Sequence, residues 1–135
     1  MEKAIEEMIR NQVGKAEETL SAAKILIKSD FPDDAISRAY YAIFHAASAV
    51  LLAEGITVKS HAALKEMFGL HLVKKGKIEK KYSQILRKLK DDREDSDYDI
   101  YTDFSGHEAK IALHDAEQFI KAMKQYLTRS HRLKL

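Results

Sequence analysis

Apolar residues recur every three or four positions along most of the chain, the spacing that places them on one face of an α-helix. In the first segment this face is formed by Ile5, Met8, Ile9, Val13, Ala16, Leu20, Ala23 and Ile27. Only one proline and five glycines interrupt the chain, and its runs of Ala, Leu, Glu and Lys favour helix over strand. The pattern predicts helices over about residues 3–27, 32–55, 60–76, 78 to beyond 90, and 105–129.

Residues at the expected helix ends support these limits. Pro32 suits the first turn of the second helix, because the N–H that proline lacks would have no partner there. Ser60 can cap the third helix, and Ser105 with Glu108 has the spacing of a capping box at the start of the last helix. Since short connections join antiparallel neighbours, the sequence predicts an all-α, up-and-down bundle of four long helices plus a short additional helix.

Length and charge set further bounds. A chain of 135 residues can bury about two-thirds of its unfolded surface around one core, so we expect a single domain over residues 1–135. The 23 Lys and Arg residues nearly balance the 21 Asp and Glu residues, and a net charge of +2 identifies no polyanionic partner. The chain has no cysteine, which excludes disulfides, thiolate metal sites and a cysteine nucleophile.

The N-terminal segment gives no sign of export. Residues 1–12 are charged from the second position onward, and no stretch is expected to approach the ~20 apolar residues of a membrane span. The absence of cysteine fits a reducing compartment. We therefore expect a soluble, cytoplasmic protein with no membrane partner and no cofactor.

The segment SRAYYAIFHAA, residues 37–47, places Arg38 and His45 in the most apolar part of the chain. Seven residues are about two helical turns, so the two side chains leave the same face. Around them stand alanines and Tyr41 rather than Lys and Glu. The opposite face is an ordinary core face, formed by Ile36, Tyr40, Ile43, Phe44, Ala47, Val50 and Leu51. We expect the alanine-lined face to be covered as well, by another helix of the bundle or by a second subunit.

Four stretches resemble one known family. They are DDAISRAYYAIFHAASAVLLAEG, KSHAALKEMF, DDREDSDYD and HDAEQFIKAM. Together they are similar to the HEPN superfamily, in particular to its small stand-alone prokaryotic proteins. The resemblance implies a helical bundle that is commonly a homodimer. It also implies a metal-independent endoribonuclease, or a toxin that is paired with a minimal nucleotidyltransferase.

The superfamily signature is an arginine followed four to six residues later by a histidine, and two places can carry it. Arg38 and His45 have this spacing inside the second helix. The ribonuclease motif more often lies ahead of the last helix, where this chain has Arg93, Asp97 and Tyr98, with the tyrosine in place of the histidine.

Chemistry separates these two pairs. Histidine titrates near 6.5 and can take a proton at neutral pH, whereas tyrosine, near 10, is a poor base. If cleavage occurs, His45 is the base, with Arg38 or Arg93 on the phosphate. Tyr98 can stack on a base or position a ribose.

The other members of the candidate binding set are Tyr41, Asp97 and His61. His61 matches a histidine common in the resembling proteins, with a local helix cap as its alternative role. A purely structural interpretation also stays open, in which Arg38 pairs with an acidic residue such as Asp97 and His45 bonds a backbone carbonyl.

A basic block precedes an acidic one. Residues 71–90 carry eight Lys or Arg against one Glu, and this stripe either tracks a nucleic-acid backbone or is a solvated helix face. Residues 91–103 carry seven carboxylates, which can pair with the basic block. Their spacing is not that of a calcium loop and no histidine stands at ligand spacing, so no metal site is predicted.

The sequence therefore predicts a nucleotide- or RNA-binding protein that is one half of a two-component, toxin–antitoxin-like module. Two alternatives stay open. One is a metal-independent endoribonuclease that uses His45 as its base. The other is a non-catalytic protein that serves dimerisation or interaction with a partner.

Overall fold

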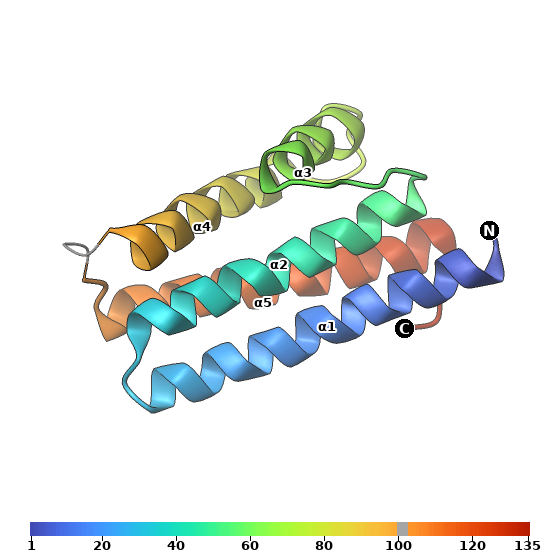
Figure 1. Cartoon of the computed structure of the whole chain (residues 1–135). Coiled ribbons are helices and arrows are strands. Elements are labelled where there is room, and N and C mark those ends of the chain that lie inside the picture. The colour runs from blue at the N-terminus through green and yellow to red at the C-terminus, as the bar shows by residue number, and fades with distance from the viewer. Residues whose placement is uncertain (100–102) are drawn as a thin grey trace.

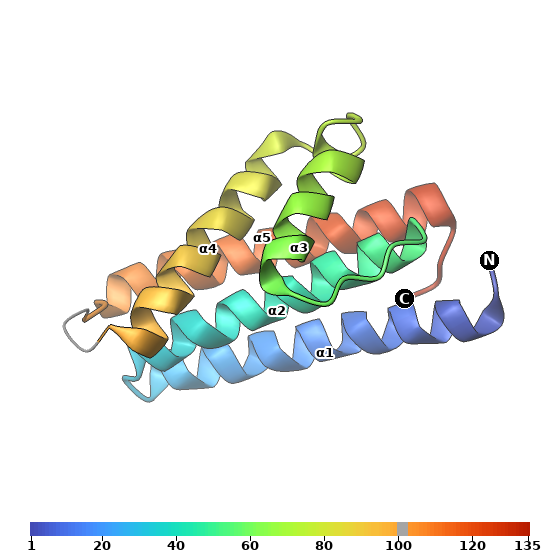
Figure 2. The same cartoon turned by 45° about the horizontal axis from the view of Figure 1, so that its top comes forward.

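The computed structural model describes residues 1–99 and 103–135, and every regular element within these ranges is helical. The elements are α1 (Lys3–Lys28), α2 (Pro32–Ala53), α3 (His61–Phe68), the π-helical turn η1 (Gly69–Val73), α4 (Lys80–Tyr98) and α5 (Gly106–His131). Helices α1, α2 and α5 run alongside one another, while α4 packs across α2 with the short α3 beside it (Figures 1 and 2). The predicted bundle of four long helices with one short additional helix is confirmed.

Helix α2 is the centre of the bundle and packs against α1, α4 and α5. Its alanine-lined face meets α1, and the small side chains let the two helices approach closely. Ala35, Ala42, Ala46 and Ala49 on this face are each at most 2% exposed. The sequence predicts that either a helix of the same chain or a second subunit covers this face. In the structure, a helix of the same chain covers it. The alanines of this face are therefore buried within the chain, whereas Arg38 on the same face stays exposed.

The prediction that no stretch approaches a membrane span is wrong for α2. This helix is long and apolar enough to cross a membrane by length and composition. However, 72% of the apolar window is buried inside the bundle. The apolar length of α2 is accounted for by its contacts with three neighbouring helices, as in the core helix of a soluble protein.

The predicted helix starts are confirmed by hydrogen bonds. The Ser60 hydroxyl accepts a bond from the backbone N–H of Ala63 at 3.0 Å, and Ser105 and Glu108 form both bonds of the capping box. The third predicted helix is not α-helical throughout. Its last turn, η1, is closed by a bond from the Lys74 N–H to the Gly69 carbonyl, five residues back.

Candidate functional site

Arg93 is a buried cation that α4 carries into the bundle. It is 6% exposed, and its guanidinium carbon lies 5.1 Å from the ring centroid of Tyr40 and 5.6 Å from that of Tyr41. Its ion pair with Asp97, one turn along α4, is long at 3.8 Å. Within residues 1–99 and 103–135, no hydrogen-bond partner reaches Nε of Arg93. A buried N–H group without a partner costs free energy, and such groups occur where a ligand or a water molecule supplies the missing hydrogen bond.

An open cavity of about 700 Å³ lies beside this arginine. We call it the Arg93 cavity, and it is lined by Tyr41, His61, Arg93, Glu94, Asp95, Tyr98 and Asp99. It lies where the C-terminal half of α4 meets α2 and the first residue of α3. Three of its lining residues are carboxylates and one is an arginine. Tyr98 is 76% exposed, so its ring is accessible at this cavity.

His61 contributes an imidazole to the Arg93 cavity. The hydroxyl oxygen of Tyr40 lies 2.7 Å from its Nδ1. Burial raises the pKa of Tyr40 to about 12 against the opposing charge of Arg93, so the phenol is protonated at neutral pH and can donate a hydrogen bond to Nδ1. In the neutral ring the remaining proton is then on Nε2. Burial, with the charges of Arg93 and Lys90, lowers the pKa of His61, which keeps the ring neutral at pH 7.

A second cavity, of about 300 Å³, lies between α1 and α2. We call it the Arg38 cavity, and it is lined by Lys15, Glu18, Thr19, Ala22, Arg38, Tyr41 and His45. Arg38 is exposed, and neither Arg38 nor Lys15 forms an ion pair with a described residue. Two cations and one carboxylate thus line this cavity, so cations outnumber carboxylates here. In the Arg93 cavity, carboxylates outnumber cations.

His45 has a defined hydrogen-bond partner in the Arg38 cavity. Its Nδ1 lies 2.8 Å from Oε1 of Gln12, an amide oxygen that can only accept, so Nδ1 carries the proton and Nε2 has the lone pair. Burial, followed by the charges of Lys15 and Arg38, lowers the pKa of His45. The neutral ring at pH 7 therefore offers a proton acceptor, whereas His61 offers a donor.

Tyr41 lines both cavities. The guanidinium carbon of Arg38 lies 4.8 Å from its ring centroid, and that of Arg93 lies 5.6 Å away. The ring of His61 also contacts it in an edge-on arrangement, at 5.9 Å between centroids. Cations at these distances are attracted to an aromatic face. The two cavities are thus neighbours that share one aromatic side chain.

Comparison with known proteins identifies the family at this point. The HEPN domain model matches residues 9–126. The chain belongs to the HEPN domain family. Both cavities lie within the matched region.

Several relatives cover nearly the whole HEPN chain. A protein of Methanocaldococcus jannaschii with the name "Putative toxin" is 42% identical over 129 residues, 94% of each chain. A second protein of that organism with the same name is 30% identical over 134 residues, 99% of this chain and 91% of the relative. A UPF0332 protein of Thermotoga maritima is 32% identical over 113 residues, covering 84% and 86% of the two chains.

The HEPN bundle divides the candidate residues between the two cavities. Arg38, Tyr41 and His45 line one cavity, and His61, Arg93 and Tyr98 line the other together with Tyr41. The expected face shared by Arg38 and His45 is confirmed. The two contacts of the purely structural interpretation are not formed by the described residues, because Asp97 pairs with Arg93 and His45 bonds the side chain of Gln12. The bond to Gln12 is an internal partner, so a structural role for His45 stays a prediction. The helix cap belongs to Ser60, which leaves the His61 side chain for Tyr40.

Sequence reasoning missed the polar partners that come from other helices of the HEPN fold. The prediction that Tyr40 belongs to the core face is confirmed, and its hydroxyl also contacts His61. Gln12 and Lys15 lie on the polar side of α1, and nothing in their spacing indicates that they face α2. One feature of the sequence does point to a polar role for Tyr40. A tyrosine on a buried helix face needs a hydrogen-bond partner for its hydroxyl.

The basic and acidic blocks pair in part along α4. Lys88 and Asp92 lie 2.8 Å apart, and Lys90 and Glu94 lie 2.7 Å apart, each pair one helical turn along. The predicted pairing of the two blocks is thus confirmed at these positions. Because each pair consumes a cation of the stripe, the charge available for a nucleic-acid backbone is lower than the sequence indicates. Of the two blocks, positions 100–102 lie outside the described residues.

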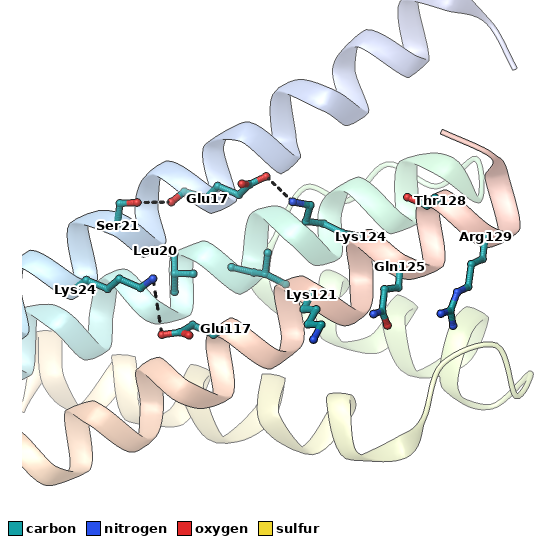
Figure 3. A pocket seen from close by; sticks show the side chains of 11 residues that line it. Glu17, Leu20, Ser21, Lys24, Glu117, Lys121, Lys124, Gln125, Thr128 and Arg129 are labelled. Carbon is teal, nitrogen blue, oxygen red and sulfur yellow. Dashed lines mark hydrogen bonds and ion pairs between the residues drawn. The ribbon is translucent and has the colours of Figure 1, made fainter. Parts of the chain in front are cut away.

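A third cavity, of about 530 Å³, is a groove between α1 and α5, and it contains none of the candidate residues. Figure 3 shows two ion pairs across it, from Lys124 to Glu17 at 3.2 Å and from Lys24 to Glu117 at 4.0 Å. Charges that face this groove are therefore partly satisfied within the HEPN chain. Exposed pairs of this kind contribute little to stability.

Proposed function

We propose that this HEPN protein binds RNA or a nucleotide and that the Arg38 cavity holds a phosphate group of that ligand. The observation that carries this proposal is the charge of the cavity. Arg38 and Lys15 face it, and neither forms an ion pair with a described residue. A phosphate would supply the missing counter-charge through charge-assisted hydrogen bonds, which arginine forms well because of its planar fork. Neutral His45 adds no repulsion to this site.

The rest of the ligand would follow Tyr41 toward Arg93. Single-stranded RNA is commonly bound by aromatic side chains on which unpaired bases stack. Tyr41 and the exposed Tyr98 are suitable for such stacking, and Tyr41 joins the two cavities. The site would then consist of Arg38, Tyr41 and His45 with Arg93, Tyr98 and His61.

The direct test is binding of a short, labelled oligoribonucleotide, measured by fluorescence anisotropy at low salt. Arg38→Ala should weaken binding by roughly 1.5–3 kcal/mol, the scale of a hydrogen bond to a charged group. Because Arg38 is exposed, its loss should change the free energy of unfolding by about 0.5 kcal/mol or less. Arg129→Ala, an exposed arginine of α5, is the matched control. Unchanged binding by Arg38→Ala contradicts the proposal.

The family relatives named as toxins support a toxin-like role for this chain. We extend that role to a two-component module, in which a homodimer of this protein is held in check by an antitoxin-like partner, as the resemblance to nucleotidyltransferase-linked HEPN proteins implies. Induced expression of the chain alone should slow the growth of a host cell. Arg38→Ala should relieve the slowing, because it removes the proposed phosphate contact. Growth that does not respond to the wild-type chain contradicts a toxin-like role.

A second candidate function, metal-independent RNA cleavage, is favoured by the state of His45. Its Nε2 carries a lone pair at neutral pH and it shares the cavity with Arg38. A ribose 2′-hydroxyl placed there would have a base for its proton and a cation for the charge that develops on phosphorus. Tyr98 stands where the ribonuclease motif has a histidine, and for this reason binding is the function we place first.

A further inference from the structure

The Arg93 cavity differs from the Arg38 cavity in its charge. Glu94, Asp95 and Asp99 line it together with a single arginine. The hydrogen bond and charge of Lys90, outweighing a small effect of desolvation, lower the pKa of Glu94, so this carboxylate is ionised at neutral pH. Three carboxylates would repel a phosphate group. The ligand of this cavity therefore has to present hydrogen-bond donors as well as acceptors.

The independent sign that this cavity takes a ligand is Arg93. The residue is 6% exposed and lines the cavity, while its Nε lacks a hydrogen-bond partner among the described residues. Its ion pair with Asp97 is too long for a strong hydrogen bond. Because Nε is itself enclosed by protein atoms, the donors that Arg93 can offer to an acceptor in the cavity are its terminal Nη–H groups.

Among the nucleobases, guanine matches this combination best. Its O6 and N7 are adjacent acceptors, which a guanidinium binds in a bidentate manner. Its N1–H and N2–H₂ groups are adjacent donors, which a carboxylate can accept. Adenine and cytosine each present one exocyclic amino donor beside acceptors, and uracil has no amino group. Guanine alone presents two neighbouring donor nitrogens on one edge and two neighbouring acceptors on another, so it can form two bonds with an arginine and two with a carboxylate.

We propose that the Arg93 cavity binds a guanine base, with Arg93 as donor and Asp95 as acceptor. Asp95 is the carboxylate we name because Lys90 already holds Oε1 of Glu94 at 2.7 Å, whereas Asp95 forms no ion pair with a described residue. The inference rests on the nucleotide-binding function proposed above and adds the identity of the base.

The surroundings of the cavity fit a flat ring. Tyr98 is 76% exposed and Tyr41 half-buried, so both rings are accessible for stacking. Tyr41 also lines the Arg38 cavity. A guanosine whose base lies by Arg93 would thus have its phosphate directed across Tyr41, toward Arg38 and Lys15. The negative cavity takes the base and the positive cavity takes the phosphate.

The test compares short uridine oligomers that carry one central guanosine, inosine or adenosine, with binding measured by fluorescence anisotropy. Inosine differs from guanosine only in lacking the N2 amino group. The wild-type protein should bind the guanosine oligomer about tenfold more tightly than the inosine oligomer, the scale of one base-specific contact. Asp95→Asn should bring the two affinities together, because it removes the acceptor for the N2 amino group. Asp91→Asn, which removes an exposed carboxylate from the same helix, should keep the tenfold preference.

The outcomes separate this inference from the function on which it rests. Equal binding of the guanosine and inosine oligomers by the wild-type protein overturns guanine recognition and leaves RNA binding in place. A guanosine preference that survives Asp95→Asn overturns the role of Asp95 in it. Absence of binding to every oligomer overturns both proposals.

Discussion

The hydroxyl of Tyr40 lies 2.7 Å from Nδ1 of His61, which couples the most buried tyrosine of α2 to the first residue of α3. The contact joins two residues that are 21 positions apart in the chain. With the phenol as donor, the proton of the neutral ring is on Nε2, and His61 lines the Arg93 cavity. A core residue thus determines the chemistry of a surface cavity.

Removing this hydroxyl should change His61 in a measurable way. The phenol of Tyr40 can donate to the neutral ring and accept from the protonated one, so Tyr40→Phe should change the pKa of His61, as measured by an NMR titration of its Cε1–H signal. The free energy of unfolding should fall by about 1 kcal/mol, because one part-buried hydrogen bond is lost. Tyr82→Phe removes a hydroxyl that forms no hydrogen bond with a described residue, and it serves as the control. An unchanged pKa of His61 in Tyr40→Phe would show that the bond does not hold the tautomer.

The two histidines also predict how stability depends on pH. Burial lowers the pKa of both His45 and His61 in the folded state, so the unfolded chain binds protons more readily than the native protein below about pH 6.5. The contribution of the two neutral histidines to the free energy of unfolding is fully present above that pH. It is lost as the pH falls toward the pKa values of these residues in the folded protein. Urea unfolding between about pH 7.5 and 5.5 should therefore show a falling free energy of unfolding.

Substitution of these rings checks the assignment. His45→Gln and His61→Gln should each flatten the dependence of the free energy of unfolding on pH in this range, because each removes one group that titrates differently in the two states. His107→Gln, which removes an exposed imidazole at the start of α5, is the control. A slope that is the same in all three variants and the wild type would exclude both histidines as its source.

Cleavage at the Arg38 cavity has its own signature. With His45 as the base, cleavage should increase as the pH rises through the lowered pKa of this residue and should persist in EDTA. The products should carry 2′,3′-cyclic phosphates, because the attacking group is the ribose 2′-hydroxyl. His45→Ala should abolish cleavage while RNA binding persists through Arg38. RNA that is bound yet recovered intact across about pH 5 to 9 identifies a binding protein instead.

Assembly is a separate prediction. The resemblance implies a homodimer, so light scattering at tens of micromolar protein should give twice the chain mass of 15.4 kDa. The alanines on this face of α2 are covered by α1, so they are not themselves contacts between subunits. Enlarging that face with Ala42→Leu should therefore destabilise the folded chain by about 1–3 kcal/mol rather than dissociate a dimer. A monomer mass for the wild-type protein at this concentration contradicts the prediction.

The sequence by itself determined the helices and much of their ends. The three- and four-residue spacing of apolar side chains is a local property that the chain carries into any fold, and caps such as Ser60 and Ser105 act within one helical turn. The sequence also determined that Arg38 and His45 share a face, since two turns of one helix fix their relation. The chemistry available, with no thiol and few histidines, was readable from composition.

Only the tertiary structure decided which groups from different helices meet. Packing of α1 on α2 brings Gln12 to His45, and packing of α3 and α4 on α2 brings His61 and Arg93 to Tyr40. These contacts depend on how each helix is rotated about its axis and on the angle at which it crosses its neighbours. The apolar pattern of the sequence shows only which broad face of a helix is buried, so it does not determine these contacts. For this reason the sequence supplied two candidate pairs, and the bundle arranged them as two cavities on either side of Tyr41.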